Sequence, residues 1–165
     1  ARAWAGERNV PAFDAKVLPS VMTAHVVFDA LDPGVPATLS SKTIQQLLRE
    51  ELRYDGVCIS DDLFMKGISP SGGADPEEVA RAAVGAIDAG CDMVLVCHAG
   101  PAADACHRAL VERAERDPSF AARAREAFGR VQTMRQTLVG KPALSGEALR
   151  RRIGHTSLND LVCGC

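Results

Sequence analysis

The sequence has no apolar run long enough to cross a bilayer, and it has no excess of either charge, because its formal net charge is −2. These absences give no support for a membrane-spanning segment or for a nucleic-acid or anionic-membrane partner. The one basic cluster is more typical of a solvated helix face than of a binding patch: Arg150, Arg151 and Arg152. With 47% hydrophobic and 24% charged residues in 165 positions, we expect one globular domain or a piece of a larger one.

Cysteine patterns that bind metals or form redox pairs are also missing. None of the six cysteines forms a C-x-x-C pair, and the closest spacing is the C-x-C of Cys163 and Cys165. The other four lie in or beside predicted strands and helices: Cys58, Cys91, Cys97 and Cys106. Because buried cysteine behaves as a small hydrophobe, we expect most of these to be core thiols in a reducing compartment, hence a cytoplasmic protein with no metal site and no cofactor.

Motifs for nucleotide binding and for serine hydrolysis are absent as well. The sequence holds no G-x-G-x-x-G, no Walker loop and no G-x-S-x-G elbow. The pair Gly72 and Gly73 is too short to form a phosphate cradle and indicates a loop. Dinucleotide, nucleoside-triphosphate and nucleophile-elbow sites therefore have no support.

The most informative stretch is residues 56–65, Gly-Val-Cys-Ile-Ser-Asp-Asp-Leu-Phe-Met. Residues 57–60 predict a short buried strand, which runs directly into the carboxylates of Asp61 and Asp62. Either carboxylate could simply cap the next element, since Asp suits helix starts and turns. Two carboxylates in a row at the end of a buried strand favour a catalytic role, because parallel sheets carry their chemistry at the carboxyl ends of their strands.

The remaining pattern alternates strands with amphipathic helices. Strands are predicted at 20–27 and 92–98, and helices at 42–52, at 76–89 and then at 101–116 and 119–138. Ser40 or Ser41 could cap the first helix, while Asp75 caps the second and Gly90 ends it. Residues 1–17 are expected to be the end of a helix and a connector, and the residues from 140 onward a polar tail. This order predicts an α/β fold with a parallel sheet, as part of a barrel or of a doubly wound sheet.

Polar groups follow all three predicted strands. His25 follows the first, Asp61 and Asp62 the second, and His98 the third. Because the carboxyl ends of parallel strands meet at one edge of a sheet, we expect these side chains to line the rim of a pocket. Carboxylates there can act as nucleophile, acid, base or metal ligand, and the pattern does not choose among these roles.

Residues 47–63 resemble the signature of family-3 glycoside hydrolases, and more narrowly that of bacterial β-N-acetylglucosaminidases acting on cell-wall muropeptides. Residues 21–26 and the loop from 32 to 40 resemble the family's sixth strand and the loop after it, and residues 89–97 its eighth strand. The resemblance covers residues 11–98 well. It implies that residues 1–139 are strands six to eight of a (β/α)₈ TIM barrel, followed by the tail at 140–165.

The resemblance also implies the chemistry. Asp61 matches the family's catalytic nucleophile, which attacks the sugar and forms a covalent glycosyl-enzyme in a retaining mechanism. The implied reaction removes terminal β-linked N-acetylglucosamine from cell-wall-derived glycans, as in peptidoglycan recycling. The expected partners are this carbohydrate and the missing N-terminal part of the barrel. Pocket-lining roles are expected for His25, Asp62, Met65 and His98. Phe64 stands where the family usually has a small residue, so it either narrows the pocket or packs behind the loop.

The sequence also departs from the family by an absence. The family's acid/base motif, Lys-His-Phe-Pro-Gly-His-Gly, does not occur, so we expect a C-terminal fragment that is inactive alone. Its three strands would leave two open edges, and the side chains expected to face the barrel interior are those of Val57, Ile59, Val94 and Val96.

Two other functions remain open. A receiver-like signalling module also places paired Asp residues at a strand exit, where they hold magnesium and accept phosphate. Against it, the acidic pair here follows the second predicted strand rather than the first, and no strand exit carries Lys. The other possibility is a non-catalytic barrel piece that only stabilises a partner chain.

Overall fold

The computed structural model describes residues 18–72, 74–98, 100–138 and 147. Nearly all of these belong to the first of two compact units, residues 1–135, and the description below concerns that unit. Of the second unit, residues 136–165, only the end of one helix and Glu147 are described. The connector predicted at 1–17 and nearly all of the predicted polar tail lie outside the described residues.

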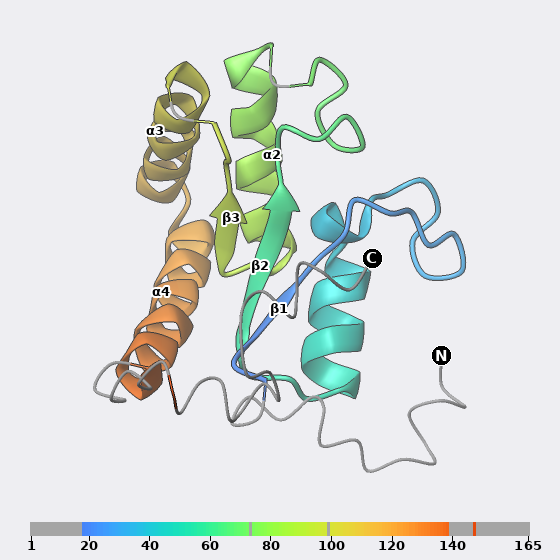
Figure 1. Cartoon of the computed structure of the whole chain (residues 1–165), viewed down its shortest axis with the longest axis vertical. Helices are drawn as coiled ribbons and strands as arrows, with labels where there is room; N and C mark the ends of the chain where they lie inside the picture. The colour runs from blue at the N-terminus through green and yellow to red at the C-terminus, as the bar shows by residue number, and fades with distance from the viewer. Residues whose placement is uncertain (1–17, 73, 99, 139–146, 148–165) are drawn as a thin grey trace. The chain divides into compact units, whose positions relative to one another are not determined.

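Three parallel strands form the centre of the described unit: β1 (Ser20–Met22), β2 (Val57–Asp62) and β3 (Met93–Leu95). Their order in the sheet is β1-β2-β3, with all three arrows pointing the same way in Figure 1. Met22 pairs with Ile59, and Ile59 pairs with Met93. The predicted α/β class with a parallel sheet is therefore confirmed.

Two of the strands are shorter than their sequence patterns predicted. β1 ends at Met22 rather than at residue 27, although the Thr23 amide still donates to the Ile59 carbonyl at 2.8 Å. β3 covers only residues 93–95 of the predicted 92–98. Conversely, β2 extends two residues further than predicted and includes both carboxylates. Apolar runs indicated where strands begin, but their ends depend on where the neighbouring strand stops pairing.

The helices lie close to their predicted positions. Among the described residues they are η3 (Lys42–Glu51), α2 (Pro76–Ala89), α3 (Pro101–Arg116) and α4 (Pro118–Leu138), together with the 3₁₀ turn η2 (Ala37–Leu39). η3 is wider than an α-helix, and it ends with the Leu52 amide donating to the Leu47 carbonyl at 2.9 Å, five residues back. Figure 1 shows α2 and α3 next to each other.

Local capping explains two helix boundaries. The Asp75 carboxylate accepts from the Glu77 amide at 3.0 Å at the start of α2. Gly90 ends α2 with a φ of 120°, a value that favours glycine. Of the two serines predicted as caps for η3, Ser40 performs that role, since its hydroxyl accepts from the Thr43 amide at 3.1 Å.

Two apolar clusters hold the helices against the sheet. One joins Leu63, after β2, to buried residues of α2 and α3, and the other joins Cys58 of β2 to Ile44 of η3 and to the end of α2. Val94 packs against both clusters and Val96 against the first. The prediction that these two valines face a barrel interior is therefore wrong, because their side chains point toward the helices.

The opposite face of the sheet carries a row of apolar side chains. Since neighbouring residues of a strand point to opposite faces, and Cys58 faces the helices, Ile59 faces away from them. Its strand partners Met22 and Met93 lie on the same face, where they are 58% and 37% exposed. We call Met22, Ile59 and Met93 the open-face row.

Candidate catalytic site at the carboxyl edge of the sheet

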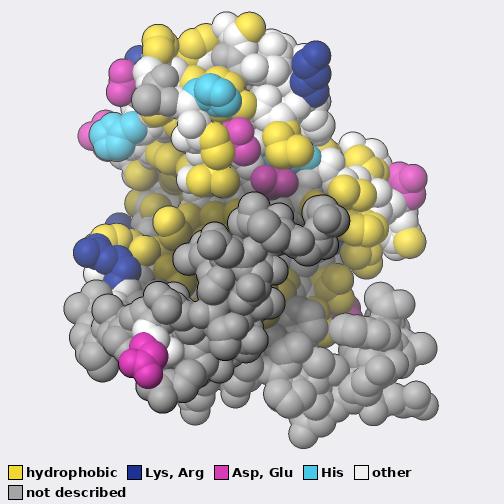
Figure 2. Space-filling view, in the orientation of Figure 1, with side chains coloured by type: hydrophobic (Ala, Val, Ile, Leu, Met, Phe, Trp, Pro, Cys, Tyr) yellow, Lys and Arg dark blue, Asp and Glu magenta, His cyan; other side chains and the backbone are white. Residues whose placement is uncertain are grey.

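The three polar strand exits meet at the carboxyl edge of the sheet, as predicted. His25 follows β1, Asp61 and Asp62 close β2, and Cys97 and His98 follow β3. In the space-filling view, acidic side chains lie among apolar ones in the upper half of the molecule (Figure 2). Hydrogen bonds join all three exits through Asp62.

His25 is held on both of its ring nitrogens. Its Nδ1 lies 2.8 Å from the hydroxyl of Thr38, and its Nε2 lies 3.0 Å from the main-chain carbonyl oxygen of Asp62. The Thr38 hydroxyl lies in turn 2.8 Å from that of Thr23. Thr38 is completely buried. Both nitrogens of His25 are thus engaged within the protein.

The two adjacent carboxylates have different surroundings. Asp62 Oδ1 accepts from the amides of Phe64 at 3.2 Å and Cys97 at 3.1 Å, so this side chain ties the end of β2 to the end of β3. Asp61 Oδ1 accepts only from the Asp62 amide, at 2.8 Å. Within the described ranges, Asp61 Oδ2 has no hydrogen-bond partner. Asp62 Oδ1 therefore holds the loop between β2 and β3, whereas Asp61 is held by one neighbouring amide; among the described residues the second oxygen of each carboxylate has no hydrogen-bond partner.

The exit of β3 brings a thiol and a ring to the same edge. The pKa of the Cys97 thiol is raised, first by partial desolvation and then by the negative charge of Asp62. Cys97 is exposed, whereas Cys58, Cys91 and Cys106 are buried, so the expectation that most of these four thiols belong to the core is confirmed. Cys97 lies beyond β3 because that strand ends at Leu95.

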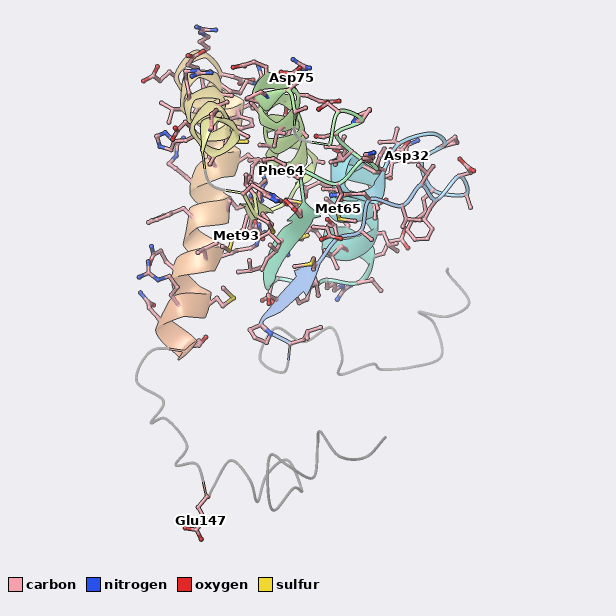
Figure 3. All side chains as sticks on the ribbon, turned by 45° about the horizontal axis from the view of Figure 1, so that its top comes forward. Asp32, Phe64, Met65, Asp75, Met93 and Glu147 are labelled. Atoms are coloured by element: carbon pink, nitrogen blue, oxygen red, sulfur yellow. The ribbon has the colours of Figure 1, made fainter. Side chains whose placement is uncertain are left out.

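The side chain of Phe64 packs behind the loop. Its ring lies 4.7 Å from that of His98, centroid to centroid, and it contacts the cluster of Leu63, α2 and α3. Met65, the next residue, is 47% exposed. Figure 3 shows both at the end of β2. Of the two orientations left open for Phe64, the structure supports packing, and it leaves Met65 and His98 exposed at the edge.

Sequence reasoning missed Thr38. This residue lies in the turn η2, inside a stretch predicted only as a loop, and it reaches His25 because the loop folds back on β1. The Ala37 amide donates to the Val26 carbonyl at 2.9 Å, and Val27 pairs with Pro36. No local pattern of Thr38 marks this contact, which depends on the path of the loop.

An ionic cluster around Asp92 was also missed. Its buried carboxylate accepts from Arg49 of η3 at 2.6 Å, and from Arg123 and Arg130 of α4 at 2.5 and 3.2 Å. It also accepts from the Cys58 amide at 2.9 Å. Arg123 and Arg130 are seven residues apart, so they share a helix face, and that spacing was the available signal. The cluster holds η3 and α4 against the sheet, at the end opposite Asp61 and Asp62.

Two buried thiols lie next to this cluster. Cys58 and Cys91 belong to the same apolar cluster and are both completely buried. The hydrogen bond between the two thiols, together with burial, raises the pKa of Cys91. Cys91 therefore stays protonated at neutral pH and behaves as core.

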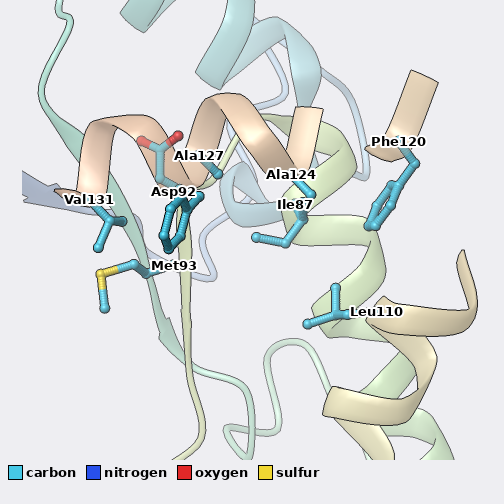
Figure 4. A pocket seen from close by; sticks show the side chains of 9 residues that line it. Ile87, Asp92, Met93, Leu110, Phe120, Ala124, Ala127 and Val131 are labelled. Carbon is cyan, nitrogen blue, oxygen red and sulfur yellow. The ribbon is translucent and has the colours of Figure 1, made fainter. Parts of the chain in front are cut away.

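One crevice lies away from the carboxyl edge. It has a volume of about 310 Å³ and is walled by Ala124, Ala127 and Val131 of α4, facing Ile87 and Leu110 (Figure 4). Its one ionisable lining residue is Asp92, which already forms ion pairs with three guanidinium groups. Because this carboxylate is committed to ion pairs at the amino end of β3, the crevice offers no group for acid–base or nucleophilic chemistry.

The described residues form neither a metal-binding cluster nor a membrane-spanning helix. No group of three or more His, Cys, Asp or Glu side chains there could hold a metal ion. No helix in the same part of the chain combines the length and the apolar character that a bilayer crossing needs.

Comparison with known families gives one clear match. The model of the glycosyl hydrolase family 3 N-terminal domain matches residues 10–134 of this chain. That range includes β1, β2, β3 and the whole carboxyl edge described above.

Individual relatives agree with the family match. A β-hexosaminidase of Bordetella avium is 45% identical over 89 residues, which cover 54% of this chain and 24% of that protein. A family-3 β-N-acetylglucosaminidase of Paenibacillus superposes with a TM-score of 0.64 at 37% identity, covering 77% of this chain and 24% of its own. A β-N-acetylhexosaminidase of Beutenbergia cavernae gives a TM-score of 0.60 at 36% identity, covering 78% and 38%. The chain thus spans about a quarter to two fifths of the length of these three relatives.

Proposed function

This chain belongs to glycosyl hydrolase family 3, and from that premise we propose that it is the nucleophile-bearing part of a β-N-acetylhexosaminidase. Its relatives are named β-hexosaminidases, and those superposed on it are a β-N-acetylglucosaminidase and a β-N-acetylhexosaminidase. The substrate class is a glycan with a terminal β-linked N-acetylglucosamine, and a cell-wall-derived muropeptide fits the resemblance of residues 47–63.

The observation that carries the proposal is the difference between the two carboxylates. Asp61 has one oxygen fixed by the Asp62 amide at 2.8 Å, whereas Asp62 binds two amides across the loop. A nucleophilic carboxylate must be oriented without being tied to the surrounding loop, and Asp61, held only by the neighbouring amide, meets this condition better than Asp62, whose Oδ1 joins two segments. Asp62 orients the loop and does not attack.

The proposed reaction has two steps. In the first, Asp61 attacks the anomeric carbon, the glycosidic C–O bond breaks, and the leaving oxygen takes a proton from an acid outside this chain. In the second, water attacks the glycosyl-aspartate ester and releases the sugar with its configuration retained. The family's acid/base motif is absent from this sequence, so we assign the acid and most sugar-holding residues to barrel segments outside these 165 residues.

The architecture proposed for the complete enzyme is a (β/α)₈ barrel. β1, β2 and β3 would be its strands six, seven and eight, and residues 140–165 would be a tail beyond it. Three consecutive parallel strands with helices on one face fit this arrangement, and so does the open-face row of Met22, Ile59 and Met93, which would face the barrel interior.

The test is a pair of isosteric substitutions in the full-length enzyme. Asp61→Asn should lower kcat on an aryl β-N-acetylglucosaminide by several orders of magnitude, roughly 10⁴-fold, because the amide cannot form the glycosyl ester. Asp62→Asn should lower it less, by roughly 10- to 100-fold, because it loosens the loop without removing the attacking group.

Thermal unfolding of both variants serves as the control for folding. An active Asp61→Asn enzyme beside an inactive, folded Asp62→Asn enzyme would move the nucleophile by one position. The family match over residues 10–134 overturns the receiver-like alternative. A folded, full-length wild-type enzyme inactive on N-acetylhexosaminides would overturn the proposed function.

A further inference from the structure

A chain of side-chain contacts runs from the loop after β1 to the end of β2. The hydroxyls of Thr23 and Thr38 are 2.8 Å apart, Thr38 lies 2.8 Å from His25 Nδ1, and His25 Nε2 lies 3.0 Å from the Asp62 carbonyl oxygen. The side chain of Thr38 is buried and that of His25 is partly buried. His25 therefore has a fixed position between two strand exits.

The chemistry of these groups assigns the proton on the ring. A carbonyl oxygen only accepts, so His25 Nε2 must carry the hydrogen and donate it to Asp62. In the neutral ring, Nδ1 then accepts from the Thr38 hydroxyl, whose oxygen accepts from Thr23. Every donor in the chain meets an acceptor, and the ring keeps no nitrogen for a substrate.

The group that His25 holds is the peptide next to the proposed nucleophile. The Asp62 amide donates to Asp61 Oδ1 at 2.8 Å, and Asp62 Oδ1 accepts from the amides of Phe64 and Cys97. The loop after β2 is also packed on His25, since a Cβ added at Gly67 would lie 3.2 Å from His25 Cβ. Asp62 is thus held from β1 by His25 and from β3 by Cys97.

We propose that His25 is a positioning residue that orients the Asp61 carboxylate through the main chain of Asp62, and that it does not contact the substrate. This role rests on the proposed function, because it takes Asp61 as the nucleophile. It replaces the pocket-lining role expected from the sequence. The consequence is that changes at His25 act on turnover more than on substrate binding.

Two amide substitutions separate the ring's two contacts. In His25→Gln, the side-chain amide reaches about as far as Nε2 and can still donate to the Asp62 carbonyl. In His25→Asn, it reaches only as far as Nδ1 and keeps the Thr38 side of the chain. His25→Ala removes both contacts.

In the full-length enzyme we expect His25→Ala and His25→Asn to lower kcat by roughly 100-fold, because a small displacement of a reacting group costs about that much. His25→Gln should stay within roughly tenfold of wild type, and KM should change by less than about threefold in all three. His107→Gln, at an exposed position of α3, is the matched control and should change neither constant.

Nitrogen-15 NMR of the histidine rings gives a readout independent of activity and of variant folding. We expect the Nε2–H tautomer for His25 in the wild-type protein. An Nδ1–H tautomer would overturn the proposal, as would a folded His25→Ala enzyme with wild-type kcat. A raised KM with unchanged kcat would show that the ring contacts the substrate instead. A wild-type enzyme without hexosaminidase activity would overturn the proposed function and this role together, whereas the other outcomes overturn only the role.

Discussion

At the scale of single residues, two carboxylates with similar sequence contexts have different roles: one stabilises the fold and the other is available for chemistry. Asp61 and Asp92 both lie at strand ends, but Asp92 is buried among Arg49, Arg123 and Arg130, while Asp61 has one amide partner. A carboxylate that neutralises three guanidinium groups is committed to the fold. One with a free oxygen at the carboxyl edge is available for chemistry.

The first stability prediction concerns Asp92. Asp92→Asn leaves three cations around a neutral amide, two of them with side chains only 9% and 11% exposed, so unfolding free energy should fall by about 3–5 kcal/mol. Glu77→Gln removes an ion pair with Arg108 whose side chains are 59% and 57% exposed, and it should cost less than about 1 kcal/mol. Urea unfolding measures both. Equal losses would show that the Asp92 cluster is no stronger than a surface pair.

The second stability prediction concerns Tyr54 and the loss of folding stability at alkaline pH. Burial raises its pKa to about 12 from an ordinary 10, and its hydroxyl donates to the Leu18 carbonyl at 3.1 Å. Because the folded state holds this proton more tightly than the unfolded state does, the contribution to stability is complete below pH 10. It is lost between pH 10 and 12, up to about 3 kcal/mol. Tyr54→Phe should flatten the fall in stability over that window. An unchanged slope in that variant would assign the fall to other groups.

Sequence reasoning located the acidic pair and His25 because their signal is local: a polar residue directly after an apolar run. It missed Thr38 and the Asp92 cluster because those contacts join segments 13 to 43 residues apart. It placed Val94 and Val96 on the wrong face because the facing of β3 follows its register against β2, in which Met93 rather than Val94 pairs with Ile59.

At the scale of elements, helix boundaries were easier to predict than strand ends. Gly90 and the prolines at the starts of α2 and α3 act through their own backbone geometry, and Asp75 acts through a hydrogen bond to an amide two residues away, so a local sequence pattern reveals each of them. The ends of β1 and β3 depend on pairing with β2. The run from residue 20 to 27 favours a strand throughout, but the chain leaves the sheet after Thr23 and forms a loop closed by Val27 and Pro36.

Gly90 gives the element-scale prediction. Its φ is 120°, and an added Cβ would lie 2.8 Å from Ile44 Cγ2 and 2.7 Å from Gln45 Nε2, so Gly90→Ala should lower unfolding free energy by about 2–4 kcal/mol. Gly129→Ala is the matched control, because the site is open within α4, and it should raise stability by about 0.5–1 kcal/mol. Thermal melts compare the two. A neutral Gly90→Ala would show that the turn between α2 and β3 can relax.

At the scale of the whole molecule, η3, α2 and α3 pack on one face of the sheet, and the open-face row lies on the other. Val21, Cys58 and Val94 point into the helix-side clusters, while Met22, Ile59 and Met93 form the open-face row. In the described ranges β1 and β3 each pair on one side only, so both edges of the sheet are open. Closed barrels have neither open edges nor an uncovered inner face.

We therefore expect residues 1–165, expressed alone, to associate and to show no hydrolysis of an aryl β-N-acetylglucosaminide. Association follows from the open edges and from Met22 and Met93, and inactivity follows from the absent acid/base motif, which leaves the departing oxygen without a proton donor. Light scattering after size-exclusion chromatography measures the first, and an end-point assay the second.

Paired surface variants identify the face of the sheet that is responsible for association. Met22→Lys with Met93→Lys should shift the chain toward monomer, because two charges on the open-face row oppose its burial. Val111→Lys, at a 42% exposed position on α3, should leave association unchanged. A compact wild-type monomer that cleaves the aryl glycoside would contradict both expectations, because the described sheet would then close without further strands and the acid would come from within this chain.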